Sequence, residues 1–188
     1  MKIPLIALLS LAALSAPVLA DEAALLNEAR GIASKMPAKL LSVLNDEIDK
    51  GGHASAIMFC HDKAPQMAKA LADQTGWAIR RVSLKNRNPK AVPDAWEKRV
   101  LEEFDRRLSA GEMPMDIEKS EVVTLDGQKM FRYMKALPTQ EVCLSCHGTP
   151  DKITPEVQAK LTELYPDDKA TGYGLKQLRG AITVKKSM

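Results

Sequence analysis

The sequence has no marked excess of charge and only three cysteines. Lysine and arginine number 27 and aspartate and glutamate 24, a near balance that argues against a nucleic-acid partner and against a strong preference for anionic membranes. A chain of 188 residues can bury a core without disulfide staples. Internal repeats, low-complexity tracts and linker-like stretches are also missing from the sequence, so we expect a single domain.

Long apolar runs are missing except at the N-terminus. Behind a basic start, an uncharged and mostly apolar stretch extends to Ala20, the pattern of a secretory signal with a small residue at its cleavage site. The stretch is short for a membrane span and contains Pro4 and Pro17, which favours cleavage over a retained anchor. We therefore expect residues 1–20 to be removed, and residues 21–188 to form one periplasmic domain without a stable membrane anchor.

One short motif stands out in the second half of the chain. Cys143, Cys146 and His147 form a C-x-x-C-H pattern, the attachment signature of a c-type haem. The pattern predicts two thioether bonds to a single haem, with His147 as the proximal iron ligand. A redox dithiol, half of a zinc site or a chance match are the alternatives. Export favours haem, because covalent attachment takes place outside the bacterial cytoplasm, where a free dithiol tends to oxidise.

The third cysteine, Cys60, needs an explanation of its own. An unpaired thiol in an oxidising compartment is a liability unless it is buried, bonded or ligated. Cys60 therefore joins His61, His53 and Met58 as a candidate for the sixth iron ligand. Each candidate also has a structural interpretation: Cys60 and Met58 suit an apolar core, and the two histidines suit solvated positions.

Periodicity predicts an α+β domain built on an antiparallel sheet with helices to one side. Helices are expected at residues 21–50, 54–75, 93–111 and 155–165, and strands at residues 77–83, 121–125, 128–137 and 179–184. Pro37 and Pro65 should kink or divide their helices, and the glycines at 51–52 should end the first one. A tight Asp-Gly turn at 126–127 should close a hairpin. The apolar stripe of the first helix favours packing within the domain, with a homodimer seam as the alternative.

Four basic residues lie on or just after the strand expected at residues 77–83. Guanidinium groups pair well with carboxylates, so Arg80, Arg81, Lys85 and Arg87 are candidate contacts for the haem propionates. A solvated strand edge is the alternative. Because side chains alternate along a strand, only some of the four can face the haem.

Several stretches are similar to one known family. They are residues 60–65, 77–89, 93–97 and 143–148, with 165–166, 172–173 and 179–181 in the tail. Together they resemble a family of exported c-type haem domains with a PAS-like fold, long catalogued only as a domain of unknown function. Its members occur alone or as the extracytoplasmic sensor part of histidine kinases and chemoreceptors. The resemblance covers nearly the whole of the expected mature chain.

The resemblance also implies a ligand. In that family the cysteine that matches Cys60 is an axial ligand opposite the histidine of the motif, so Cys60 is the expected distal ligand and His61 the runner-up. The sequence departs from the family pattern at Lys176 and Gln177, where a glycine and an acidic residue are expected. This departure concerns the last turn before the closing strand.

Two functions fit these features. A redox or small-gas sensor needs a ligand that can leave, so that nitric oxide or carbon monoxide can reach the iron, and a signalling partner that detects the change. The alternative is a periplasmic electron-transfer cytochrome with a redox partner and two permanent ligands. The resemblance favours the sensor, and the place of the motif, after a hairpin and before a strand, is unlike the common small cytochromes. A filled sixth position argues against an enzyme.

Overall fold

The computed structural model describes residues 16–188. Residues 1–15 of the expected signal segment therefore lie outside the described residues, and cleavage after Ala20 stays a prediction. Within residues 16–188, no helix combines the length and the apolar character needed to cross a bilayer.

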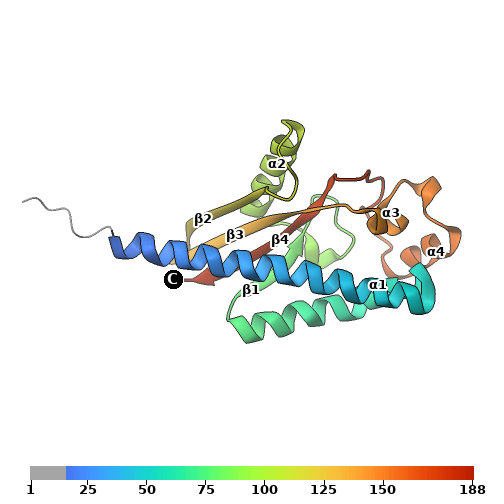
Figure 1. Cartoon of the computed structure of the whole chain (residues 1–188), viewed down its shortest axis with the longest axis horizontal. Helices are drawn as coiled ribbons and strands as arrows, with labels where there is room; N and C mark the ends of the chain where they lie inside the picture. The colour runs from blue at the N-terminus through green and yellow to red at the C-terminus, as the bar shows by residue number, and fades with distance from the viewer. Residues whose placement is uncertain (1–15) are drawn as a thin grey trace, which may run out of the picture.

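A four-stranded antiparallel sheet forms the centre of the domain (Figure 1). Its strands are β1 (Ala78–Val82), β2 (Glu118–Leu125), β3 (Gln128–Pro138) and β4 (Leu178–Ser187), in the spatial order β1-β4-β3-β2. All four strands were expected from the alternation of side chains, and the α+β class is confirmed. The closing strand β4 runs between β1 and β3, so the last segment of the chain lies in the middle of the sheet.

The hairpin of β2 and β3 turns where the sequence predicts. Asp126 and Gly127 take φ values of 50° and 79° between the paired residues Leu125 and Gln128. Two successive positive φ values define the turn type that suits the right-handed twist of paired strands, and aspartate and glycine tolerate them best.

Helices cover both faces of the sheet, and the expectation of helices on one side is wrong. The helix α1 (Ala16–Thr75) packs Ile32 and Ala33 against Phe131 of β3 and Val184 of β4. The helix α2 (Ala95–Ser109) packs on the opposite face, where its Phe104 lies in one apolar cluster with alternate residues of the same strands. Neighbouring residues of a strand point to opposite faces of the sheet. Consecutive buried residues therefore belong alternately to the core under α1 and to the core under α2.

The long helix α1 is divided by glycine rather than by proline. Gly52 has φ 74° and ψ 178°, the only non-helical backbone within the element, and the chain reverses there into a second arm that returns to β1 (Figure 1). Pro37 and Pro65 both lie within helix, so the predicted division at these prolines is wrong. A proline removes one backbone hydrogen bond and helix can continue past it, whereas a positive φ turns the chain out of the helix.

Two short helices connect β3 to β4 and lie near the bend of α1 (Figure 1). They are α3 (Glu141–His147) and α4 (Pro155–Leu164), and Thr154 caps α4 by accepting a hydrogen bond from the Val157 backbone N–H. Val157 and Leu161 of α4 share an apolar cluster with Ile57 of the second α1 arm. This cluster fixes the second arm against the segment that follows the C-x-x-C-H motif.

The start of β4 requires two unusual backbone conformations. Gly180 has φ 140°, and a Cβ added there would lie 2.2 Å from the carbonyl oxygen of Val82 in β1. Lys176 has φ 64°, at one of the two positions where the resemblance leads us to expect a glycine and an acidic residue. The last turn therefore keeps the glycine-like conformation without the glycine.

The close approach at Gly180 leads to a stability prediction. Gly180→Ala should lower the free energy of unfolding by about 3 kcal/mol, because the new Cβ forces β1 and β4 apart and strains the backbone. Chemical denaturation measures the loss. The control is Gly31→Ala in α1, where no atom lies within 4 Å of the new Cβ and a gain of about 0.5–1 kcal/mol is expected. Equal stability of the two variants would contradict the prediction.

Candidate functional site

The helix α3 carries all three residues of the C-x-x-C-H motif. Thr139 holds the chain at its start, since its backbone N–H donates to the Gln177 carbonyl at 2.8 Å and its hydroxyl to the Gly174 carbonyl at 2.6 Å. Within a helix, residues three and four apart share a face, so Cys143, Cys146 and His147 lie together. None of the cysteines in residues 16–188 forms a disulfide.

The imidazole of His147 is fixed through one nitrogen. Its Nδ1 lies 2.7 Å from the Ala170 carbonyl oxygen, which can only accept, so we assign the proton to Nδ1. This tautomer leaves Nε2 with a lone pair for a metal. Burial lowers the pKa of His147 well below its usual value, and the nearby charges of Arg179 and Arg87 lower it further. His147 is therefore a neutral imidazole, the form that binds iron.

Cys60 reaches the motif from the second arm of α1. Burial raises the pKa of the half-buried Cys60 thiol, and the positive charges of Arg81 and Arg87 act in the opposite direction. Burial lowers the pKa of Arg81, and the nearby thiols of Cys60 and Cys143 act in the opposite direction. The α1 thiol and the α3 thiol are therefore both close enough to the Arg81 guanidinium to affect its pKa.

The other candidates for the sixth iron ligand are less well placed to reach the C-x-x-C-H motif. Met58 is 41% exposed and lines a groove with Glu47 and Met67, on the side of the helix away from Cys60. His61 is exposed, and its Nδ1 lies 2.6 Å from Asp62 Oδ1.

His53 follows directly on the Gly52 bend, nearly two helical turns before Cys60. Cys60 is the one of the four candidates whose thiol affects the pKa of a motif residue, Cys146, in agreement with the preference from the sequence.

Three of the four basic candidates surround the motif. Arg81 is half-buried, and its Nε, which is itself buried, has no hydrogen-bond partner among residues 16–188. Arg87 donates to the Cys146 carbonyl at 2.6 Å and to Asp168 Oδ2 at 2.9 Å. Lys85 donates to the Thr171 carbonyl at 2.5 Å. Arg81 is therefore the guanidinium that keeps a free donor for a carboxylate.

Arg80, the fourth candidate, points to the opposite face of the sheet. Its guanidinium forms an ion pair with the buried carboxylate of Glu97 and donates to the Val92 carbonyl at 3.3 Å. Alternation along β1 separates it from Arg81. The propionate role predicted for Arg80 does not agree with this position, because its donors are already used on the α2 side.

Arg179 and Tyr173 complete the site, although no role for either was predicted from the sequence. Arg179 is 5% exposed, and it donates to Ser83 Oγ at 3.1 Å while its Nε lies 3.2 Å from His147 Nδ1. The Tyr173 ring meets the His147 ring edge-on with a centroid distance of 6.4 Å. An arginine at the head of an otherwise apolar strand was the signal that could have identified Arg179.

The donor set fits a covalently bound haem better than the alternatives. Burial raises the pKa of Cys146 to about 11, whereas redox dithiols and zinc ligands need a thiolate at neutral pH. Residues 16–188 also contain no group of three or more histidine, cysteine or acidic side chains placed to hold a metal ion by themselves. Two thiols, a free imidazole nitrogen, a third thiol and the unpaired Arg81 are what such a haem requires.

Comparisons with known proteins agree with this fold. No curated protein matches the sequence. The crystal structure of the cyanobacterial haem protein Tll0287 matches with a TM-score of 0.62 and 24% sequence identity, over 86% of this chain and 96% of that one. The fold is therefore shared, and the expected PAS-like α+β architecture is confirmed. The family model described as Tll0287-like matches residues 16–187, so this chain belongs to the Tll0287-like family.

Proposed function

We propose that this chain is a periplasmic c-type haem protein that acts as a redox or small-gas sensor. The observation that carries the proposal is that Cys60 lies close enough to Cys146 of the motif and to Arg81 to affect the pKa of both, while Arg81 in turn affects the pKa of His147. The solved relative is itself described as a haem protein. A bound haem would supply one-electron chemistry and an iron that can bind gases.

Each residue of the site has a separate task in this proposal. The thiols of Cys143 and Cys146 would form the two thioether bonds, and Nε2 of His147 would be available to bind the iron because Ala170 holds its Nδ1. Arg81 offers its unpaired Nε to a propionate. Lys85 and Arg87 act mainly by fixing the loop behind the motif, since both already donate to backbone carbonyls in or after it.

Cys60 is the residue that would make the protein a sensor. As a thiolate, Cys60 would favour ferric over ferrous iron and would be held less strongly by the reduced haem. Burial disfavours a released thiolate, so Cys60 would take up a proton as it leaves. The second arm of α1, fixed at the Gly52 bend and at β1, would then relax, and the open position could admit nitric oxide or carbon monoxide.

An electron carrier is the alternative, and a partner protein is required in either case. A carrier keeps both ligands, whereas the sensor releases one, so the coordination of the ferrous state separates the two functions. Neither function involves turnover of a substrate, and we propose that the chain is not an enzyme.

Covalent attachment gives the first prediction. The double variant Cys143→Ala/Cys146→Ala should lose all haem that survives denaturing gel electrophoresis, while each single variant should keep one thioether and part of the haem stain. Cys60→Ala is the control and should retain the full stain, because Cys60 forms no thioether. Haem that stays attached in the double variant would contradict the proposal.

The distal ligand gives the second prediction. In Cys60→Ala the ferric haem should change from six-coordinate low-spin to five-coordinate or water-bound high-spin, measured by absorption and electron paramagnetic resonance spectra. Met58→Ala and His61→Ala are matched controls on the same helix and should leave the spectra unchanged. An unaltered six-coordinate haem in Cys60→Ala, in both oxidation states, would rule out Cys60 as the ligand.

Carbon monoxide distinguishes the sensor from the carrier. On reduction of the wild-type protein, the sensor should lose its low-spin spectrum and bind carbon monoxide at micromolar concentration. A carrier would keep its low-spin spectrum in both oxidation states and bind the gas slowly or not at all. The second outcome would contradict the sensor function and support electron transfer. It would not contradict the proposal that the protein binds haem.

A further inference from the structure

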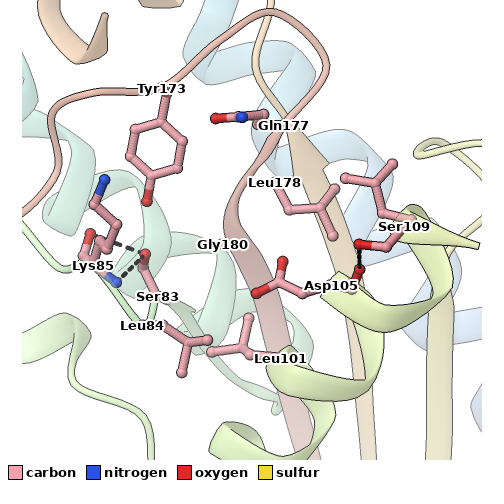
Figure 2. Close-up of a pocket in the computed structure, with 11 residues that line it drawn as sticks. Ser83, Leu84, Lys85, Leu101, Asp105, Ser109, Tyr173, Gln177, Leu178 and Gly180 are labelled. Carbon is pink, nitrogen blue, oxygen red and sulfur yellow. Dashed lines mark hydrogen bonds between the residues drawn. The ribbon is translucent and has the colours of Figure 1, made fainter. Parts of the chain in front are cut away.

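A half-open cavity of about 310 Å³ lies between α2 and the start of β4 (Figure 2). Leu101 of α2, Leu84 after β1 and Leu178 of β4 give it an apolar wall. Its volume falls at the lower end of the range for pockets that hold small organic molecules. None of the roles assigned to the haem site uses this cavity.

One charged group in the cavity has no protein partner. The Asp105 side chain takes part in no hydrogen bond or ion pair within the part of the chain that the structure describes, and Figure 2 shows its carboxylate pointing toward Gly180 at the cavity floor. Burial raises the pKa of Asp105, and the charge of Glu102 raises it further. Asp105 is an exposed residue of the cavity lining, and its carboxylate, beside that of Glu102, attracts a cation.

The basic residue of the cavity wall is already engaged. Lys85 Nζ donates to the Thr171 carbonyl at 2.5 Å and lies 4.5 Å from the centre of the Tyr173 ring. Its ammonium group is therefore held at the rim, and no ion pair between Lys85 and Asp105 forms. An anion in the cavity would be repelled by the Asp105 carboxylate, and no free positive charge in the cavity wall would offset this repulsion.

We propose that this cavity binds a small organic cation, whose ammonium group pairs with Asp105 and whose apolar body lies against Leu84, Leu101 and Leu178. The hydroxyl of Tyr173 and the side-chain amide of Gln177 line the same space and offer additional hydrogen bonds. An inorganic divalent cation fits less well, because such ions need several oxygen ligands and the cavity provides one carboxylate. The combination of one carboxylate with a leucine wall selects an amphipathic amine.

The cavity shares a wall with the haem motif. Tyr173 lines the cavity with its hydroxyl end, and the same ring packs edge-on against His147. Ser83 also lines the cavity, and its hydroxyl accepts a hydrogen bond from Arg179, which lies beside His147. A ligand in the cavity would therefore contact Tyr173, which packs against His147, and Ser83, which accepts a hydrogen bond from the neighbouring Arg179.

Calorimetry on the purified full-length protein tests the binding. We expect 2-phenylethylammonium to bind, and 2-phenylethanol, which has nearly the same shape without the charge, to bind at least about 10-fold more weakly. Asp105→Asn should weaken ammonium binding by about 10-fold or more and leave the alcohol unaffected. Glu102→Gln is the matched control, since it removes a neighbouring charge outside the cavity wall, and it should change ammonium binding less than about 3-fold.

Three results would overturn the proposal: no ammonium binding by the wild type, no preference for the ammonium over the alcohol, or equal effects of Asp105→Asn and Glu102→Gln. Leu84→Trp provides a second variant, because Leu84 is 39% exposed at the cavity and an indole there should fill it without disturbing the core. This variant should abolish binding of both compounds while keeping the thermal unfolding midpoint. Retained binding in Leu84→Trp would place the ligand elsewhere.

A redox titration tests the connection to His147 and rests on the proposed haem function. Saturating 2-phenylethylammonium should shift the midpoint potential of the wild type and leave that of Asp105→Asn unchanged. Binding without any shift would overturn the connection between the two sites. Binding in a protein that carries no haem would overturn the proposed function and leave the cavity assignment standing, so the two failures are distinguishable.

Discussion

The close approach of β4 to the end of β1 at Gly180 is the constraint on which the rest of the structure depends. A side chain at this position would overlap the Val82 carbonyl, so only glycine lets the two strands pair to their ends. This pairing places Arg179 within hydrogen-bond distance of Ser83, and Arg179 then lies against the imidazole of His147. A contact in the sheet thus determines the position of the residue that would bind iron.

Buried positive charge is the second organising feature of the site. Arg81, Arg87 and Arg179 all influence the pKa of His147, and burying three cations together is costly unless each is bonded or faces a negative group. Arg87 uses Asp168 and the Cys146 carbonyl, and Arg179 uses Ser83 and Lys85. Only Arg81 keeps an unsatisfied Nε, which is the direct structural reason to expect a carboxylate-bearing group beside it. A distal thiolate at Cys60 and this positive charge would act on the iron potential in opposite directions.

The local signals in the sequence were sufficient to predict where most helices and strands lie along the chain. They were not sufficient to predict how some of these elements pack against one another. The Asp126-Gly127 turn and the Thr154 cap were found because each depends on a few neighbouring residues. The division expected at Pro37 was wrong because a helix tolerates the loss of one hydrogen bond when its face is packed. The face of Arg80 could not be decided before the register of β1 was known, since a shift of one residue exchanges the faces.

The sequence by itself determined the α+β class, the order of the strands along the chain and the C-x-x-C-H motif, because periodicity and residue spacing are local properties. The unpaired thiol made Cys60 one of four candidates for the sixth ligand, and the resemblance to a known family favoured it over the other three. Only the tertiary structure decided that α1 and α2 cover opposite faces, that Arg179 and Tyr173 lie against His147, and that Asp105 lies unpaired in a cavity beside them. These relations join residues far apart in the chain, and they arise from the pairing of β4 between β1 and β3, which no local pattern encodes.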